Sequence, residues 1–175
     1  MVRRESITRK TRSDKKVAIA PYIPDHERVW IHRISRQCGL SEGEVGLQLV
    51  QIALFEQRTI EFFSPYMKRD YRFAENIVFC GHKDAKPLTE YISDDSDRSR
   101  FKLKAPQTLQ DQLCEFQIAL GASYLSHATY ALLRYALHDL ETVRQLAPGI
   151  TKEDFTGPIR PAALSQVSKA WSIFK

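Results

Sequence analysis

Hydrophobic and polar positions follow the same order in two stretches of the chain. Each stretch begins with a short alternating segment, at residues 17–20 in the first and 101–104 in the second. A proline, a run with apolar residues every three or four positions, a glycine and a second apolar run follow. Alternation is typical of a β-strand, and the longer spacing is typical of an amphipathic helix. Each stretch is therefore predicted to form a strand, a helix, a turn and a second helix.

The two copies lie 82 positions apart and match mainly where helices begin and end. Pro24, Gly39 and Ser41 of the first copy correspond to Pro106, Gly121 and Ser123 of the second. Proline is tolerated in a first helical turn, and glycine adopts the left-handed conformation that ends a helix. Ser41 and Ser123 are predicted to be N-caps of the second helices, and Glu44 to complete a capping box with Ser41.

The apolar faces of these helices predict how the copies assemble. The first helices present Ile31, Ile34 and Cys38 in one copy and Leu109, Leu113, Phe116 and Leu120 in the other. The second helices, at about 42–57 and 124–140, are apolar over most of their circumference, which indicates burial. One copy alone is too small to bury such a helix, so we expect the two copies to pair.

Strand-helix-helix units that pair through their strands make up the ribbon-helix-helix fold. The chain resembles this superfamily, of the Arc and MetJ type, over residues 16–57 and 98–140. The resemblance implies a mainly α fold with a two-stranded antiparallel β-ribbon. Because both units lie on one chain, it also implies a monomeric pseudo-dimer. In this family the ribbon enters the DNA major groove, so the implied partner is double-stranded DNA.

The side chains that alternate with the core positions of the two strands are the candidates for groove contact. They are Lys16, Ala18, Ala20 and Tyr22 in the first strand and Arg100, Lys102 and Lys104 in the second. Arginine and lysine donate to guanine or to phosphate, and alanine can touch a thymine methyl group. The alternative is a solvated edge strand that its lysines protect from pairing.

The resemblance also implies phosphate contacts where each second helix begins, because a helix N-terminus favours anions. The candidates are Ser41 in the first copy and Ala122 and Ser123 in the second. The first copy departs from the family pattern, since Glu42 and Glu44 would repel a phosphate there.

Charge is concentrated at the N-terminus. The chain carries a formal net charge of +5, and residues 1–16, with seven basic and two acidic side chains, account for all of it. Such an arm can follow DNA phosphates, or it can serve only as a solvated tail. Beside a ribbon-helix-helix core we favour phosphate contact, with Arg3, Arg4, Arg9, Lys10, Arg12 and Lys15 as candidates.

The rest of the chain divides around the two units. Residues 1–15 form the basic arm, 16–57 the first unit, 58–99 a connection, 100–140 the second unit and 141–175 a tail. Seven aromatic residues in the connection indicate packing rather than a flexible linker, and residues 76–80 are its most strand-like or buried piece. A short amphipathic helix at 164–174 would either dock on the body or bind a partner protein.

Sequence signatures of catalysis are missing. We find no phosphate-binding loop, no nucleophile elbow and no paired-histidine motif, so we expect neither an enzyme nor a cofactor. The three cysteines match no disulfide or zinc framework, and no metal is expected. No run reaches the length of a membrane span, and the reducing cytoplasm is the expected compartment.

The tandem layout resembles the VirC-type accessory proteins of T-DNA transfer. These bind the overdrive enhancer and support relaxosome assembly, so a relaxase or another DNA-transfer protein is an implied partner. The conjugation-accessory TraY type also carries two units on one chain. Two alternatives remain on the same fold: a plasmid or toxin–antitoxin repressor, and an interaction scaffold that no longer binds DNA.

Overall fold

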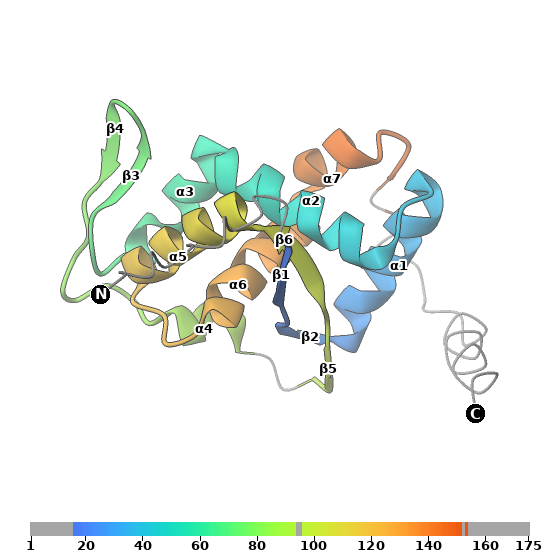
Figure 1. Ribbon diagram of the computed structural model, residues 1–175, viewed down its shortest axis with the longest axis horizontal. Helices are drawn as coiled ribbons and strands as arrows, with labels where there is room; N and C mark the ends of the chain where they lie inside the picture. The colour runs from blue at the N-terminus through green and yellow to red at the C-terminus, as the bar shows by residue number, and fades with distance from the viewer. Residues whose placement is uncertain (1–15, 94–95, 152, 154–175) are drawn as a thin grey trace, which may run out of the picture.

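The computed structural model describes residues 16–93, 96–151 and 153 (Figure 1). Within these ranges the chain is mainly helical, with seven α-helices and three short two-stranded antiparallel sheets. This confirms the predicted class. The basic arm at 1–15 and the predicted helix at 164–174 lie outside the described residues.

Four short strands form one antiparallel ribbon. Its strands are β1 (Lys16–Ile19), β2 (Tyr22–Pro24), β5 (Arg98–Arg100) and β6 (Leu103–Pro106). β1 pairs with β6 and β2 with β5 in the same register. Between the two sheets, the N–H of Phe101 donates to the carbonyl of Pro21 at 2.8 Å. Proline has no N–H to return this bond, so the ladder is interrupted at Pro21 without a change of register.

The register relates the ribbon to the sequence repeat. Ile19 faces Leu103 and Tyr22 faces Arg100, which places the centre of the ribbon at Ala20 and Lys102. These two residues are 82 positions apart, as are the two copies. Each strand therefore pairs antiparallel with the equivalent strand of the other copy.

Four helices of 14 residues each follow from the two strands. They are α1 (Asp25–Cys38), α2 (Glu42–Phe55), α5 (Gln107–Leu120) and α6 (Leu125–His138). Gly39 and Gly121 end α1 and α5 with φ angles of 67° and 62°, as predicted. The capping box of Ser41 and Glu44 is also confirmed.

The predicted N-cap at Ser123 is wrong. Helix α6 begins at Leu125, and its N-cap is Tyr124, whose side chain makes no capping hydrogen bond. The Gln117 side chain donates to the carbonyl of Ala122 at 3.0 Å. This bond stabilises the turn between α5 and α6, which is one residue longer than the turn between α1 and α2. The second copy also lacks a glutamate three residues after Ser123, so no reciprocal capping box can form.

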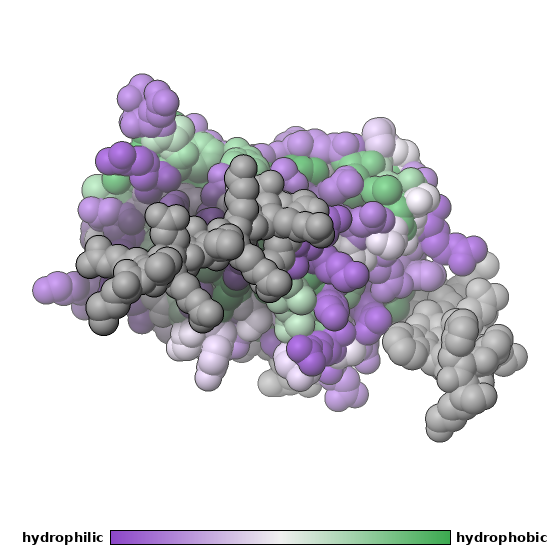
Figure 2. Space-filling view, viewed as in Figure 1, coloured by the Kyte–Doolittle hydropathy of each residue, from purple (hydrophilic) through white to green (hydrophobic). Residues whose placement is uncertain are grey.

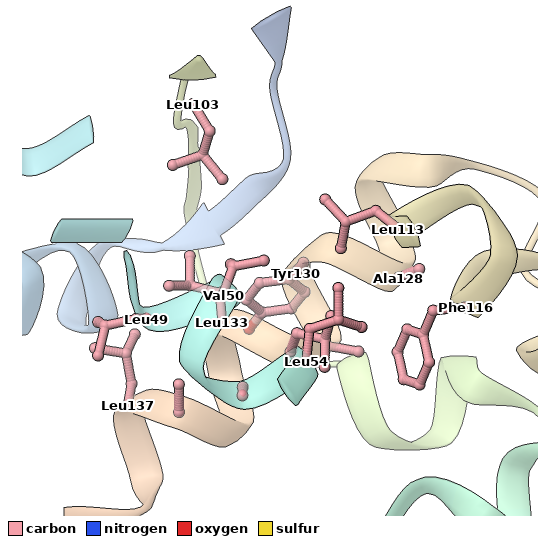
Figure 3. Close-up of a cluster of buried hydrophobic side chains, with 14 of the residues drawn as sticks. Leu49, Val50, Leu54, Leu103, Leu113, Phe116, Ala128, Tyr130, Leu133 and Leu137 are labelled. Carbon is pink, nitrogen blue, oxygen red and sulfur yellow. The ribbon is translucent and has the colours of Figure 1, made fainter. Parts of the chain in front are cut away.

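The core lies where α2 and α6 pack under the ribbon (Figure 3). Leu49, Val50 and Leu54 of α2 meet Leu133 and Leu137 of α6, with Leu103 above them on the ribbon strand, and all are at most 3% exposed. The predicted burial of these apolar helices is therefore confirmed. The outer side of α2 is an exception, because Phe55 is 52% exposed.

Each copy contains a third helix that the sequence pattern did not predict. Helix α3 (Gln57–Phe63) and helix α7 (Leu140–Leu146) each have seven residues. Each follows a single extended residue, Glu56 or Asp139. Thr59 and Thr142 occupy the same position in the two helices, and both are fully buried. The repeated unit is thus one helix longer than expected.

The connection between the copies packs partly on the core. It contains the 3-10 helix η1 (Ser64–Tyr66), strands β3 (Tyr71–Ala74) and β4 (Ile77–Phe79), and helix α4 (Leu88–Ile92). Phe63 and Tyr71 both pack against Phe116, with ring centroids 5.6 and 5.5 Å apart. β4 lies within the predicted strand-like piece at 76–80. It is not buried, because Val78 is 52% exposed and β3–β4 projects from the body (Figure 1).

Candidate nucleic-acid interface

All seven predicted groove residues lie on the outer face of the ribbon. Alternation along the strands sends Ile19, Ile23 and Leu103 into the core. The opposite face carries Lys16, Ala18, Ala20, Tyr22, Arg100, Lys102 and Lys104. Six of these are exposed, and Ala20 is half-buried. We call these seven residues the outer ribbon face.

The outer ribbon face is basic, and its cations are unevenly divided between the two strands. The register sets Ala18 opposite Lys104, and Tyr22 opposite Arg100. The face thus bears four cations and no carboxylate. Arg100, Lys102 and Lys104 form no ion pair with any residue that the structure describes. Three of the four charges belong to the second copy, which leaves an alanine-lined half and a cationic half.

Helix α2 lies directly under the ribbon because two of its residues have no side chain. A Cβ atom on Gly46 would stand 2.5 Å from the Phe101 ring, and one on Gly43 would stand 3.2 Å from the carbonyl oxygen of Lys102. Larger residues would push the ribbon outward at its centre. Two glycines inside an apolar helix are the sequence signal for such a close approach, and the sequence interpretation missed it.

Side chains of the protein already bond part of the predicted phosphate site at the start of α2. The Glu44 carboxylate accepts from the N–H and the hydroxyl of Ser41, at 3.0 and 2.7 Å. These bonds, the side-chain bond first, lower the pKa of Glu44, and nearby Lys16 lowers it further. Glu42 is bonded by His32 of α1 at 2.9 Å. Both carboxylates are therefore held in place by the protein's own side chains and backbone, and the Ser41 N–H is not free to bind a phosphate.

The equivalent site at the start of α6 is open. Ser123 is exposed, Ala122 is half-buried, and no carboxylate lies in the first turn of the helix. The amides of residues 123–126 have no hydrogen-bond partner among the described residues. The two candidate phosphate sites therefore differ in the same sense as the two halves of the outer ribbon face.

Two clefts lie on the surface that the described residues form. A shallow cleft of about 440 Å³ is lined by Phe62, Tyr91, Arg134, Tyr135, His138 and Asp139. A second, of about 580 Å³, runs along the outer side of α2 beside Gln145. Figure 2 shows hydrophobic residues along the upper edge of this view, interspersed with polar ones. No group of three or more histidine, cysteine or acidic side chains is placed to hold a metal ion within the described ranges.

Comparison with models of known protein families, with curated proteins and with solved structures found no match for this chain. Among the helices of the described residues, none has the length and apolar character that crossing a membrane requires. The functional interpretation therefore depends on the chain's own geometry and charge.

Proposed function

We propose that the chain is a single-chain ribbon-helix-helix protein that binds double-stranded DNA with its outer ribbon face in the major groove. The observation that carries the proposal is the outer ribbon face itself: four cations and no acid on a two-stranded ribbon. The major groove of B-DNA is wide enough to admit such a ribbon. Each copy contributes one strand, so one chain supplies a complete binding unit.

The two halves of the face would have different tasks. Arg100, Lys102 and Lys104 can donate to guanine O6 and N7 or to phosphates. Ala18 and Ala20 have no side-chain donors and would allow a close approach to thymine methyl groups. Ser41, Ala122 and Ser123 were the predicted phosphate contacts. Because Glu44 already bonds the N–H and hydroxyl of Ser41, we retain Ala122 and Ser123, at the open start of α6, for this role.

Within this function we favour an accessory role in plasmid or T-DNA transfer, with a relaxase or another transfer protein as partner. The support is the tandem layout, two units on one chain separated by an ordered connection. A plasmid or toxin–antitoxin repressor would use the same face. A relaxase gene beside this gene would support transfer, and a small toxin gene would support the repressor.

Equilibrium binding to labelled duplex DNA tests the proposal. The double variant Lys102→Ala/Lys104→Ala is compared with Lys83→Ala/Lys86→Ala, which removes the same charge from exposed sites on the connection. On a preferred site, the ribbon variant should lose about 1–3 kcal/mol for each base contact removed, and the control should lose much less. Equal affinity of the two variants would contradict the assignment. No duplex binding by the wild type at low salt would favour the scaffold alternative.

A further inference from the structure

A basic turn of the connection lies against the second copy. The N–H groups of Lys68 and Arg69 both donate to the carbonyl of Ala119, near the C-terminal end of α5, at 2.7 and 3.1 Å. The aliphatic part of the Lys68 side chain packs against the turn after α5, since a Cβ atom on Gly121 would lie 2.7 Å from the Cδ atom of Lys68. The connection thus fixes two cations beside the turn that leads into α6.

The opposite side of this basic turn is also held by backbone contacts. The carbonyl of Met67 accepts from the N–H of His82, and the Asp70 carboxylate accepts from the N–H of Gly81, both at 2.9 Å. A Cβ atom on Gly81 would stand 2.3 Å from the Arg69 backbone. The turn is therefore positioned without its cationic side chains. Those of Lys68 and Arg69 remain exposed and form no ion pair with described residues.

In the first copy, no other segment packs on the equivalent glycine. No atom lies within 4 Å of a Cβ built on Gly39, the counterpart of Gly121. The segment that follows α7 reaches the end of α1, where a Cβ on Gly149 would lie 2.6 Å from the Gln37 amide nitrogen. Residues 147–151 of that segment contain no charged side chain. Chain from the end of the third helix thus covers the neighbouring copy in both halves. Among the described residues it brings Lys68 and Arg69 to the second copy and no cation to the first.

We propose that Lys68 and Arg69 bind DNA phosphates outside the ribbon, so that the protein–DNA contact extends further on the side of the second copy. This inference rests on the proposed function. The start of α2 lies against the ribbon at Gly43, and α6, its equivalent, contacts β1 and β2. Cations beside the start of α6 therefore flank the ribbon, where the sugar-phosphate backbone would pass beside an occupied groove.

The salt dependence of DNA binding tests this extension. We compare the wild type, Lys68→Met/Arg69→Gln and the control Lys83→Met/Lys86→Gln on one random-sequence duplex. The substitutions keep the aliphatic stems, including the one that covers Gly121. Loss of two phosphate contacts should reduce the slope of log affinity against log salt by about two and weaken binding about tenfold at physiological salt. The control should keep the wild-type slope.

A hydroxyl-radical footprint on a selected site gives a second readout. The stretch of DNA protected by Lys68→Met/Arg69→Gln should be shorter than the wild-type stretch at one end only, with the groove contacts unchanged. An unchanged slope and footprint, with normal wild-type binding, would overturn this inference and leave the proposed function intact. Failure of the wild type itself to bind duplex DNA would contradict the proposed function and this extension together.

Discussion

Glu27 is fully buried in α1 at the position where the second copy has Leu109. Its carboxylate lies 3.4 Å from the His138 ring and 3.8 Å from the Arg134 guanidinium, both on α6. Arg134 also donates to the Tyr130 hydroxyl at 3.0 Å. A buried charge is tolerated only where partners compensate its lost hydration. This polar cluster therefore ties α1 to α6, whereas the second copy has the buried, apolar Leu109 at the position of Glu27.

Replacing Arg134 tests the cluster. Arg134→Leu leaves the buried Glu27 without its main cation and should cost about 3–5 kcal/mol of unfolding free energy at neutral pH. Denaturant unfolding at neutral pH measures this loss. The control Gln51→Leu changes the exposed tenth residue of α2, the same place in the helix that Arg134 has in α6, and should have little effect.

The double variant Glu27→Leu/Arg134→Leu separates charge from packing in this cluster. It removes both ions and places leucine where the second copy already has Leu109, so it should recover most of the lost stability. A double variant as unstable as Arg134→Leu would contradict the electrostatic account.

Buried tyrosines predict a loss of stability in alkali. Burial raises the pKa of Tyr71 and of Tyr130 to about 12. The unfolded chain releases these phenol protons near the ordinary value of about 10. Stability is therefore complete below pH 10 and falls as the pH rises from about 10 to 12. Urea unfolding across this range should show a smaller fall for Tyr71→Phe. The exposed Tyr22→Phe should keep the wild-type slope, and an equal slope for all three proteins would contradict the prediction.

At the scale of the element, the two copies begin their second helices differently. Ser41 caps α2 and exchanges hydrogen bonds with Glu44, whereas α6 begins beyond Ser123 without a side-chain cap. In the first copy, the N–H groups of Ser41 and Glu44 are thus bonded by the chain's own side chains. The helix N-terminus of the second copy keeps amides available for another partner.

Matched alanine substitutions test this difference. Ser41→Ala should cost about 1 kcal/mol of stability, as loss of an N-cap usually does, and Ser123→Ala should cost close to nothing. Because the pKa of Glu44 is lowered in the folded state, the bonds to its carboxylate stabilise at neutral pH and are lost as the pH falls through that pKa. The effect of Ser41→Ala should therefore diminish in acid. Equal losses for the two variants at neutral pH would contradict the assigned caps.

The sequence predicted elements well where local chemistry decides them. The left-handed glycines 39 and 121, the capping box and the apolar helix faces all depend on near neighbours. Helices α3 and α7 were missed because each has only seven residues and follows a single extended residue. A segment of that length is too short to show a recognisable helical period in the sequence. The longer turn before α6 depends on Gln117, which bonds Ala122, and no local rule for capping serines anticipates it.

The candidate site was likewise predictable only where a local sequence pattern decides it. Alternation assigns the outer ribbon face from sequence alone, and its exposure in the structure agrees with this. The place of Lys68 and Arg69 depends on how the connection folds back onto Ala119, a contact across about fifty residues. Nothing in the local pattern of the connection indicates which copy it covers.

At the scale of the whole molecule, the two copies are joined by polar contacts as well as by the core. Arg58, at the start of α3, pairs with Asp139 at 2.8 Å and with Glu141, both at the start of α7. The Thr142 hydroxyl donates to Asp139 at 2.6 Å and lies 3.3 Å from Glu56. The pKa of Arg58 is raised, above all by its bond to Glu56. The starts of the third helices of the two copies are thus joined by ion pairs and hydrogen bonds.

A chain that pairs its own copies needs no second chain to bury its core. Sedimentation at low concentration should give a folded particle of about 20.2 kDa, the mass of one chain. Unfolding midpoints should not depend on protein concentration, as they do when folding requires association. An obligate homodimer that unfolds on dilution would show that the copies pair between chains.

Selection of binding sites from random duplex DNA tests the central claim most directly, that one chain presents two unlike strands to DNA. A symmetric dimer reads a palindrome because it offers the same residues to both half-sites. Here Arg100, Lys102 and Lys104 oppose Ala18, Ala20 and Tyr22, so we predict a non-palindromic consensus with guanines under the cationic strand and thymines under the other. A perfectly palindromic consensus, or no enrichment of any sequence, would contradict the account.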